Sequence, residues 1–245
     1  FKSVYIVENI VVSVVDKVNF RQDIQAIRGI AVLLVVFYHT ELFFTSAGFL
    51  GVDIFFVISG YLITRIICHD LERGSFSFHS FYTRRARRIL PAAFTTILIT
   101  ALISPILLSS VTLQDFWEVA LASLVFMSNI ALWQQQGYFT STAELQPLLH
   151  MWSLSIEEQF YIFLPLLLLF TPKFWRLRTA FLLTLTSALL CFIMVFFKET
   201  PVFYLLPTRA WELGIGVVLA IMHQQKLIQA VSLPWARFWC WLGLV

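Results

Sequence analysis

Long, nearly continuous apolar runs alternate with short polar stretches along most of this 245-residue chain. Several runs reach the ~20 residues that an α-helix needs to cross the hydrocarbon core of a bilayer. We predict spans at 29–45, 48–68, 89–109, 151–170, 179–197 and 209–223, and a last span that opens near 235. The pattern therefore predicts an all-α polytopic membrane protein with about seven transmembrane helices.

Basic residues set the orientation of these spans, because Lys and Arg beside a span stay on the cytoplasmic side. Arg21 and Arg28 precede the first span, and several arginines follow the second. The first two spans should therefore form a hairpin with both ends inside and its turn, near Ser46–Gly48, outside. Residues 110–118 contain no basic residue, as an outer loop should.

Residues 117–133 form an apolar segment that is just long enough to cross. A crossing would place the basic residues Lys173, Arg176 and Arg178 outside, against the charge rule. A re-entrant or interfacial segment keeps them inside, and we favour this interpretation.

Composition supports a membrane protein, since 59% of the residues are hydrophobic and the mean hydropathy is +0.83. Soluble domains are about 45–50% apolar. Residues 1–20 are mixed in character, so we read them as an N-terminal extension of unknown structure and 21–245 as one membrane domain. The missing initiator Met and the apolar C-terminus lead us to expect a fragment that lacks later spans.

The first two spans each carry an ionisable residue, His39 in one and Asp53 in the other. Such groups cost roughly 2.5–3.5 kcal/mol each at membrane depth and usually mark a function. Arg28 lies eleven residues before His39, which places both on nearly the same helical face about 16 Å apart. If the turn is near Gly48, His39 and Asp53 lie at similar depth. Structural hydrogen bonding in a packed bundle remains the alternative.

Three stretches resemble the acyltransferase-3 integral membrane family, which includes peptidoglycan and lipopolysaccharide O-acetylases. They are Arg28 with His39 followed by GVDIFFVISGYL at 51–62, W-S-L-S-x-E-x-Q-F-Y at 152–161, and R-x-x-E-L-x-x-G at 209–216. Members normally have about ten spans. The resemblance therefore implies a truncated ten-helix acyltransferase-3 core.

Four arginines crowd a loop before the third predicted span. They are Arg84, Arg85, Arg87 and Arg88. Guanidinium groups bind phosphate bidentately, although basic clusters beside spans are often only topology signals or anionic-lipid contacts. The resemblance implies that an R-x-x-R pair engages the acyl donor, and either Arg85 with Arg88 or Arg84 with Arg87 fits the pattern.

The stretch 150–161 is polar where a span should begin, and it carries Glu157 and Glu158. Ser153 or Ser155 is expected to cap this helix, with the acids near its first turn. Capping does not explain two acids and a histidine, so we treat both glutamates as catalytic candidates. Second-tier candidates are His150, Ser155, Tyr161, Arg209 and Glu212. Of these, Arg209 and Glu212 could be a simple i,i+3 ion pair. Ser59 and Gly60 are read as small residues that allow close helix packing, as is Gly214.

The resemblance implies a membrane O-acyltransferase that moves an acyl group, in the typical case acetyl, from cytoplasmic acyl-CoA to a hydroxyl of a cell-surface or lipid-linked glycan. His39 would be the base or would itself be acylated, and Asp53 would orient it. Arg28 would attract donor phosphate or support a developing oxyanion. We expect a carboxylate from Asp53, Glu157 or Glu158 within about 8 Å of His39, close enough for contact after side-chain motion. A cavity should connect this site to the arginines.

Acyl-CoA is the expected co-substrate, and no other cofactor, metal or nucleic acid is expected. Membrane lipid and a glycan acceptor are the expected partners, in the bacterial inner membrane. A secondary transporter or channel is the alternative, because it also places ionisable residues at depth. We find no second copy of the hairpin motif, which argues against a transporter built from repeats.

Overall fold

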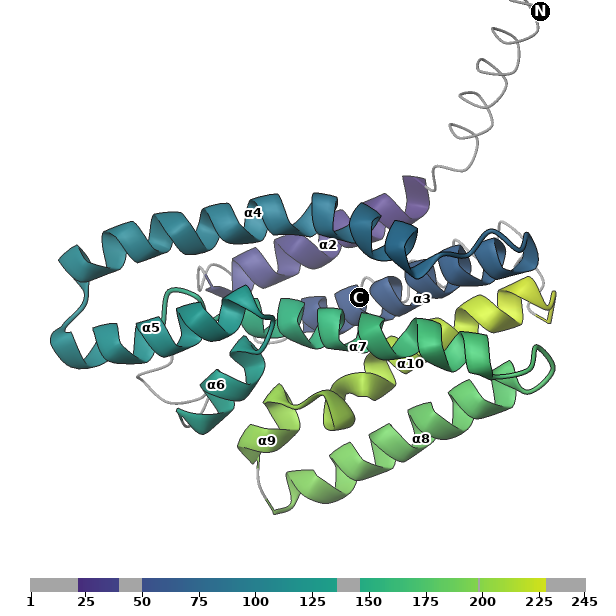
Figure 1. The fold of residues 1–245 in the computed structure, drawn as a ribbon. Helices are drawn as coiled ribbons and strands as arrows, with labels where there is room; N and C mark the ends of the chain where they lie inside the picture. The colour runs from purple at the N-terminus through teal and green to yellow at the C-terminus, as the bar shows by residue number, and fades with distance from the viewer. Residues whose placement is uncertain (1–21, 40–49, 136–145, 198, 228–245) are drawn as a thin grey trace, which may run out of the picture. The chain divides into compact units, whose positions relative to one another are not determined.

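The computed structural model describes residues 22–39, 50–135, 146–197 and 199–227, which are all-α (Figure 1). No strand occurs in these ranges. The helices are α2 (Gln22–His39), α3 (Leu50–Glu72), α4 (Phe78–Leu107), α5 (Ser110–Leu124), α6 (Ser128–Gln134), α7 (Met151–Phe170), α8 (Arg176–Val195), α9 (Glu199–Tyr204) and α10 (Leu206–Gln224).

The chain forms two compact units, 1–58 and 59–245, with the boundary inside α3. In the first unit α2 packs closely on the start of α3. A Cβ added at Gly51 would lie 2.5 Å from the carbonyl oxygen of Ala31, so this approach requires glycine. The two predicted helices of the hairpin are therefore present and adjacent. The predicted turn near Ser46–Gly48 lies outside the described residues.

The second unit is built around one core to which α3, α4, α7, α8 and α10 contribute. Its buried members are Ile63, Ile67, Cys68, Phe81, Tyr161, Leu164, Leu168, Ala180, Val217 and Ile221. Close approach again depends on glycine, as predicted: a Cβ at Gly60 would lie 2.0 Å from the carbonyl oxygen of Leu213, and one at Gly214 would lie 2.3 Å from the hydroxyl of Thr184. These contacts lock α3 and α8 against α10.

Within the described ranges, four helices are long and apolar enough to cross a membrane, namely α3, α4, α7 and α8, and α2 holds a shorter apolar stretch, Ile24–Phe37. Large apolar side chains such as Leu102, Ile106 and Phe170 are exposed. Lipid is the solvent that suits such surfaces. The prediction of a helical integral membrane protein is thus confirmed.

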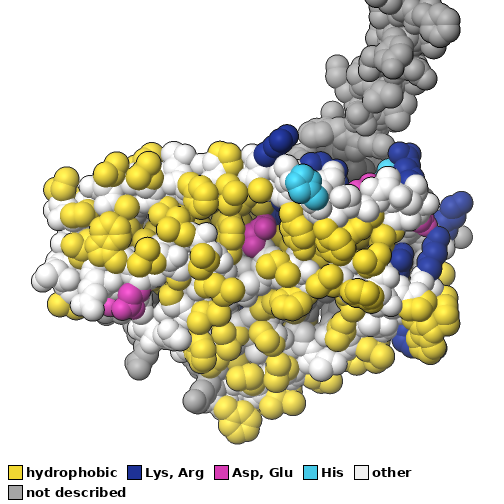
Figure 2. Space-filling view, viewed as in Figure 1, with side chains coloured by type: hydrophobic (Ala, Val, Ile, Leu, Met, Phe, Trp, Pro, Cys, Tyr) yellow, Lys and Arg dark blue, Asp and Glu magenta, His cyan; other side chains and the backbone are white. Residues whose placement is uncertain are grey.

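One end of the second unit carries most of its charge. Lys173, after α7, lies 2.6 Å from Glu72 at the end of α3, and Arg84 of α4 lies 3.2 Å from Asp70. Figure 2 shows basic side chains toward this end and hydrophobic side chains over most of the remaining face. We call it the basic end.

The start of α4 differs from the prediction. We placed the span at 89–109 with the arginines in a loop before it, but α4 already begins at Phe78 and all four arginines are helical. Pro91 lies inside the helix rather than near its start. Transmembrane helices tolerate an internal proline because neighbouring groups satisfy the freed backbone. The predicted span at 151–170, by contrast, coincides with α7.

Residues 117–133 do not form one continuous helix. α5 ends at Leu124 and α6 begins at Ser128, with Phe126 between them at a positive φ of 55°. Figure 1 shows α6 turning back from the end of α5. The side-chain amide of Gln159 holds this turn by donating to the Phe126 carbonyl at 2.9 Å and to Asn129 at 2.8 Å. α7 then ends at Phe170, shortly before Lys173 at the basic end. The break in 117–133 fits a re-entrant or interfacial segment, and that interpretation stays a prediction.

Candidate functional site

The start of α7 explains why its two glutamates lie inside the bundle. The expected serine cap is wrong: α7 begins at Met151 with His150 at its N-cap, and no acid lies in the first turn. Ser153 donates back to the His150 carbonyl at 3.1 Å, and buried Ser155 pairs with the hydroxyl of Ser128 at 2.7 Å. The helix therefore starts earlier than a serine cap would allow, which moves both acids into its second turn.

Glu157 is held by two hydroxyl groups. Ser59 of α3 donates to its Oε1 at 2.9 Å, and Tyr161, one turn further along α7, donates to its Oε2 at 3.1 Å. Among the described residues no Lys or Arg forms an ion pair with Glu157. An ionised carboxylate is an acceptor only, so two O–H donors suit its charged form and fix its orientation.

Glu158 is held differently, by a cation from α4. Nη2 of Arg85 lies 3.1 Å from Oε1 of Glu158, and each side chain is only 17% exposed. The guanidinium carbon of Arg85 also lies 3.6 Å from the centre of the Tyr161 ring, which is cation–π distance. Nε of Arg85 is buried and finds no acceptor in the described part of the chain. The two adjacent acids thus differ in their direct hydrogen-bond and ion-pair partners.

The other arginines of the cluster point elsewhere. Arg84 is exposed and pairs with Asp70 and with the hydroxyl of Ser80. Arg87 and Arg88 are also exposed. The four guanidinium groups therefore do not form one patch: Arg85 faces the interior while the other three face outward at the basic end. Each of the two proposed R-x-x-R pairs contains at least one of these outward arginines.

Arg209 and Glu212 form the predicted i,i+3 ion pair on α10. Glu212 is 1% exposed, and the Arg209 guanidinium lies 4.8 Å from the Phe203 ring centre and 5.5 Å from that of Trp152. The pair thus ties the start of α10 to α9 and to the start of α7. This geometry is that of a buried structural pair, and it lies apart from the contacts of Glu157 and Glu158.

The candidates of the first unit are placed only within that unit. Arg28 and His39 both belong to α2, as predicted, and Asp53 lies in the first turn of α3. The side chain of His39 lies outside the described residues. Its predicted approach to a carboxylate therefore stays a prediction.

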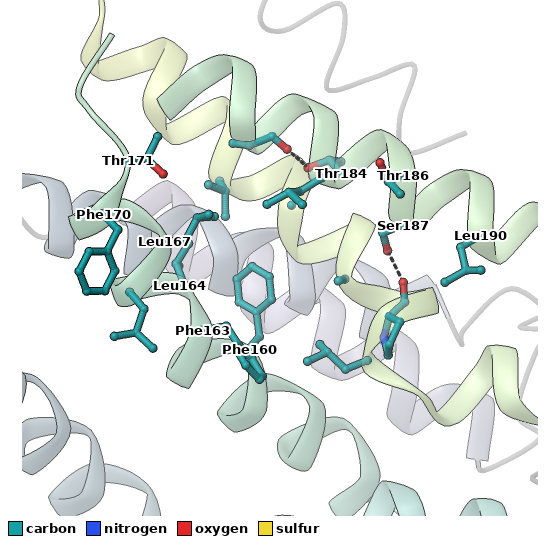
Figure 3. A pocket seen from close by; sticks show the side chains of 18 residues that line it. Phe160, Phe163, Leu164, Leu167, Phe170, Thr171, Thr184, Thr186, Ser187 and Leu190 are labelled. Atoms are coloured by element: carbon teal, nitrogen blue, oxygen red, sulfur yellow. Dashed lines mark hydrogen bonds between the residues drawn. The ribbon is translucent and has the colours of Figure 1, made fainter. Parts of the chain in front are cut away.

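An apolar groove of about 600 Å³ lies between α7, α8 and α10 (Figure 3). Phenylalanines and leucines of α7 line one side, and the hydroxyls of α8 do not point into it as free donors. Thr184 donates to the Ala180 carbonyl at 2.8 Å, Thr186 to that of Leu182 at 2.7 Å and Ser187 to that of Pro207 at 2.7 Å. None of the candidate acids or arginines lines the groove. It is therefore not the predicted channel to the arginine cluster.

Sequence reasoning missed Ser59. We read it with Gly60 as a packing residue, which is right for Gly60 but incomplete for Ser59, whose hydroxyl contacts Glu157. The available signal was the position of Ser59 inside the GVDIFFVISGYL stretch. In the described ranges, no group of three His, Cys, Asp or Glu that could hold a metal ion lies together.

Comparison with known proteins gives a family match and several relatives. The acyltransferase-3 family model, described as an acyltransferase domain, matches residues 21–245. An uncharacterized protein of Haemophilus influenzae is 38% identical over 184 residues, which cover 70% of this chain and 74% of that protein. Peptidoglycan O-acetyltransferase OatA of Listeria monocytogenes is 36% identical over 209 residues, 82% of this chain and 33% of the relative.

A third relative comes from Bacillus subtilis and is provisionally named peptidoglycan O-acetyltransferase YrhL. It is 36% identical over 220 residues, 86% of this chain and 34% of the relative. The chain thus spans about a third of the length of these two named relatives. No solved structure matches the chain.

Proposed function

Since this chain belongs to the acyltransferase-3 family, we propose that it forms the membrane domain of an O-acyltransferase that uses cytoplasmic acyl-CoA, in the first instance acetyl-CoA. The proposed acceptor is a hydroxyl of a cell-surface or lipid-linked glycan. Two relatives carry peptidoglycan O-acetyltransferase in their names, so peptidoglycan is the first acceptor to test. Both are bacterial proteins, which favours the bacterial inner membrane as the location.

One observation carries this proposal: a charged cluster lies inside the helical bundle. Arg85 of α4 and Glu157 and Glu158 of α7 belong to two helices that qualify as membrane spans. Each such group costs roughly 2.5–3.5 kcal/mol in a span, so a sequence without a use for it would replace it with an apolar residue. The cluster thus offers charges and hydrogen-bond partners for a reaction that proceeds within the membrane.

The proposed reaction is attack of the acceptor hydroxyl oxygen on the thioester carbonyl carbon. A C–O ester bond forms, the C–S bond breaks, and the hydroxyl proton ends on the thiol of coenzyme A. His39 is proposed to take that proton as general base, a contribution of typically 10²–10⁴-fold. Asp53 would orient the imidazole, and Arg28, on the same helix, would attract donor phosphate or support the developing oxyanion.

Entry of the donor from the basic end is the second part of the proposal. Arg84, Arg87 and Arg88 are exposed there, and their guanidinium groups suit a soluble polyphosphate anion. Arg85 lies deeper, against Glu158, which favours a role for it further along the donor's path. We propose that the donor meets the outer three arginines first and Arg85 afterwards.

The full-length protein in proteoliposomes tests the function. With labelled acetyl-CoA and a peptidoglycan fragment, we expect label in an O-linked ester on the acceptor, detected by mass spectrometry. His39→Ala should abolish transfer without changing membrane insertion, and His39→Gln should fail equally because Gln cannot accept a proton at neutral pH. Transfer at the wild-type rate by either variant would contradict the base assignment.

Neutralising Arg84, Arg85, Arg87 and Arg88 together tests donor binding. We expect a raised apparent KM for acetyl-CoA, because loss of uniform binding acts mainly on KM. If these arginines only set topology, cysteine labelling from the two sides would show altered orientation, and the correctly inserted fraction would keep its KM.

A further inference from the structure

Tyr161 touches both halves of the charged cluster with different parts of its side chain. Its hydroxyl donates to Oε2 of Glu157 at 3.1 Å, and its ring lies 3.6 Å below the guanidinium carbon of Arg85. The side chain is buried, with 1% of the residue exposed. Because it is buried, the Tyr161 side chain can move little without also moving Glu157 or Arg85.

Arg85 has an unsatisfied hydrogen-bond donor, its Nε–H, within the described part of the chain. It has five N–H donors, of which Nη2 contacts Glu158, while Nε is buried without an acceptor among the described residues. A buried N–H without a partner is costly because it has lost its hydrogen bond to water. An anionic oxygen that reached Arg85 would satisfy this donor and compete with Glu158 for the same guanidinium group.

Glu157 depends on two hydroxyls for its orientation. Ser59 holds one oxygen from α3 at 2.9 Å and Tyr161 holds the other from α7 at 3.1 Å. With no cation paired to it in the described structure, the direction of the carboxylate is set by these two donors. A shift of the Tyr161 ring therefore changes the placement of Glu157.

We infer that Tyr161 is a positioning residue that couples donor binding at Arg85 to the placement of Glu157, with Ser59 as the second residue that holds this carboxylate. The inference rests on the proposed function. It adds a route by which donor binding at Arg85 changes the position of Glu157. The ring of Tyr161 contacts Arg85, where the donor is proposed to bind, and its hydroxyl orients Glu157. The two contributions can be removed separately.

The test compares Tyr161→Phe with Tyr161→Leu in the full-length protein. Tyr161→Phe keeps the ring under Arg85 but removes the hydroxyl, so kcat should fall about tenfold or more, the size of one hydrogen bond to a charged group, with KM for acetyl-CoA unchanged. Tyr161→Leu removes both parts and should also raise that KM. Ser59→Ala should reproduce the Tyr161→Phe result, since it removes the other donor to Glu157.

Matched controls separate this role from packing. Tyr61→Phe removes a tyrosine hydroxyl that contacts His223 at 2.8 Å, and Ser187→Ala removes a serine hydroxyl on α8. Neither should change kcat more than about twofold, because these two hydroxyls do not contact Arg85, Glu157 or Tyr161 and sites without shared partners act independently. Thermal unfolding shows whether each variant is folded. If a Tyr161 variant does not fold, the kcat of Ser59→Ala tests the inference in its place.

Three results overturn the inference. They are a wild-type kcat in Tyr161→Phe and Ser59→Ala, an equal rise of KM in Tyr161→Phe and Tyr161→Leu, and a Ser59→Ala/Tyr161→Phe double variant that is less active than Glu157→Gln. If the wild-type protein itself transfers no acyl group, the proposed function fails instead. The two failures are therefore distinguishable.

Discussion

The two sides of α7 have opposite chemistry. Toward α3 and α4 the helix presents Glu157, Glu158 and Tyr161, which form a closed set of contacts with Ser59 and Arg85. Toward α8 and α10 the same helix presents apolar side chains to a groove of about 600 Å³. One helix thus separates a charged interior from a surface suited to hydrocarbon.

The comparison shows how each side handles polar atoms. In the charged region they meet other side chains: hydroxyl to carboxylate, and guanidinium to carboxylate and ring. In the groove the hydroxyls of Thr184 and Ser187 instead bond backbone carbonyls. Side-chain networks can be rearranged by a substrate, whereas a hydroxyl satisfied within the backbone offers little to a ligand. The difference favours the charged side as the place for chemistry.

Among changes to the two sides of α7, Glu157→Gln should have the largest effect, and that effect is on activity. The change keeps size and hydrogen-bonding shape but removes the ionisable carboxyl group, so we expect kcat to fall at least ~100-fold, in the range of a lost catalytic group. Acetyl transfer in proteoliposomes measures it. Glu118→Gln, an acid on α5 whose carboxylate contacts Gln135, is the control and should retain activity. Equal activity in the two variants would show that Glu157 is not part of the active site.

Glu158→Gln should have the next largest effect, and on stability as well as activity. It leaves Arg85 without its carboxylate in a place where both side chains are 17% exposed. Loss of one partner of a fully buried pair costs about 3–5 kcal/mol, and partial exposure should reduce this to about 1–3 kcal/mol. Thermal unfolding in detergent should show the loss. Adding Arg85→Gln should restore part of the lost stability. If the stability losses of the two single variants simply add in the double variant, the two residues are not coupled.

A smaller effect is expected when the outer arginines are neutralised and Arg85 is kept. For Arg84→Gln/Arg87→Gln/Arg88→Gln we expect a rise in KM for acetyl-CoA of about fivefold, since exposed charges contribute only modestly. The rise should shrink at high salt because exposed charges are screened. Arg178→Gln, a basic residue that lies over Trp175 at the same end, is the control. A KM change of the same size in the control would mean that general charge, and not this cluster, attracts the donor.

The smallest effect belongs to the groove side of α7. Phe163→Leu changes an exposed apolar residue for another, so stability should change by less than about 0.5 kcal/mol and activity by less than about twofold. Thermal unfolding and acetyl transfer check both values. A large loss of activity would show that the groove takes part in the reaction and would break the distinction between the two sides.

Hydrophobic pattern and charge predicted most of the helices. Run length predicted the helix at 151–170, and the positive-inside rule favoured a 117–133 segment that does not cross as one span, which agrees with its break between α5 and α6. The start of α4 did not, because we expected the arginines to lie in a loop and the span to begin beside Pro91. Within α4 these arginines occupy helical positions, and an internal proline is tolerated in a membrane helix.

The candidate site was predicted only in part. Local patterns identified Glu157, Glu158, Arg85 and the Arg209–Glu212 pair, because a motif or a helical spacing links those residues. The Ser59–Glu157 hydrogen bond joins residues 98 apart in the chain. No local period encodes such a contact, since it depends on how α3 packs against α7. Likewise, the side chain of Arg85 points inward and that of Arg84 points outward because of which side of α4 faces α7.

The most direct test of the central claim is acetyl transfer by the full-length protein in proteoliposomes, wild type against Glu157→Gln. We predict that the wild-type protein moves label from acetyl-CoA to a glycan hydroxyl, and that Glu157→Gln, inserted to the same level, is at least ~100-fold slower. Transfer at the same rate by both proteins would show that the charged cluster of α7 is not where this acyltransferase works.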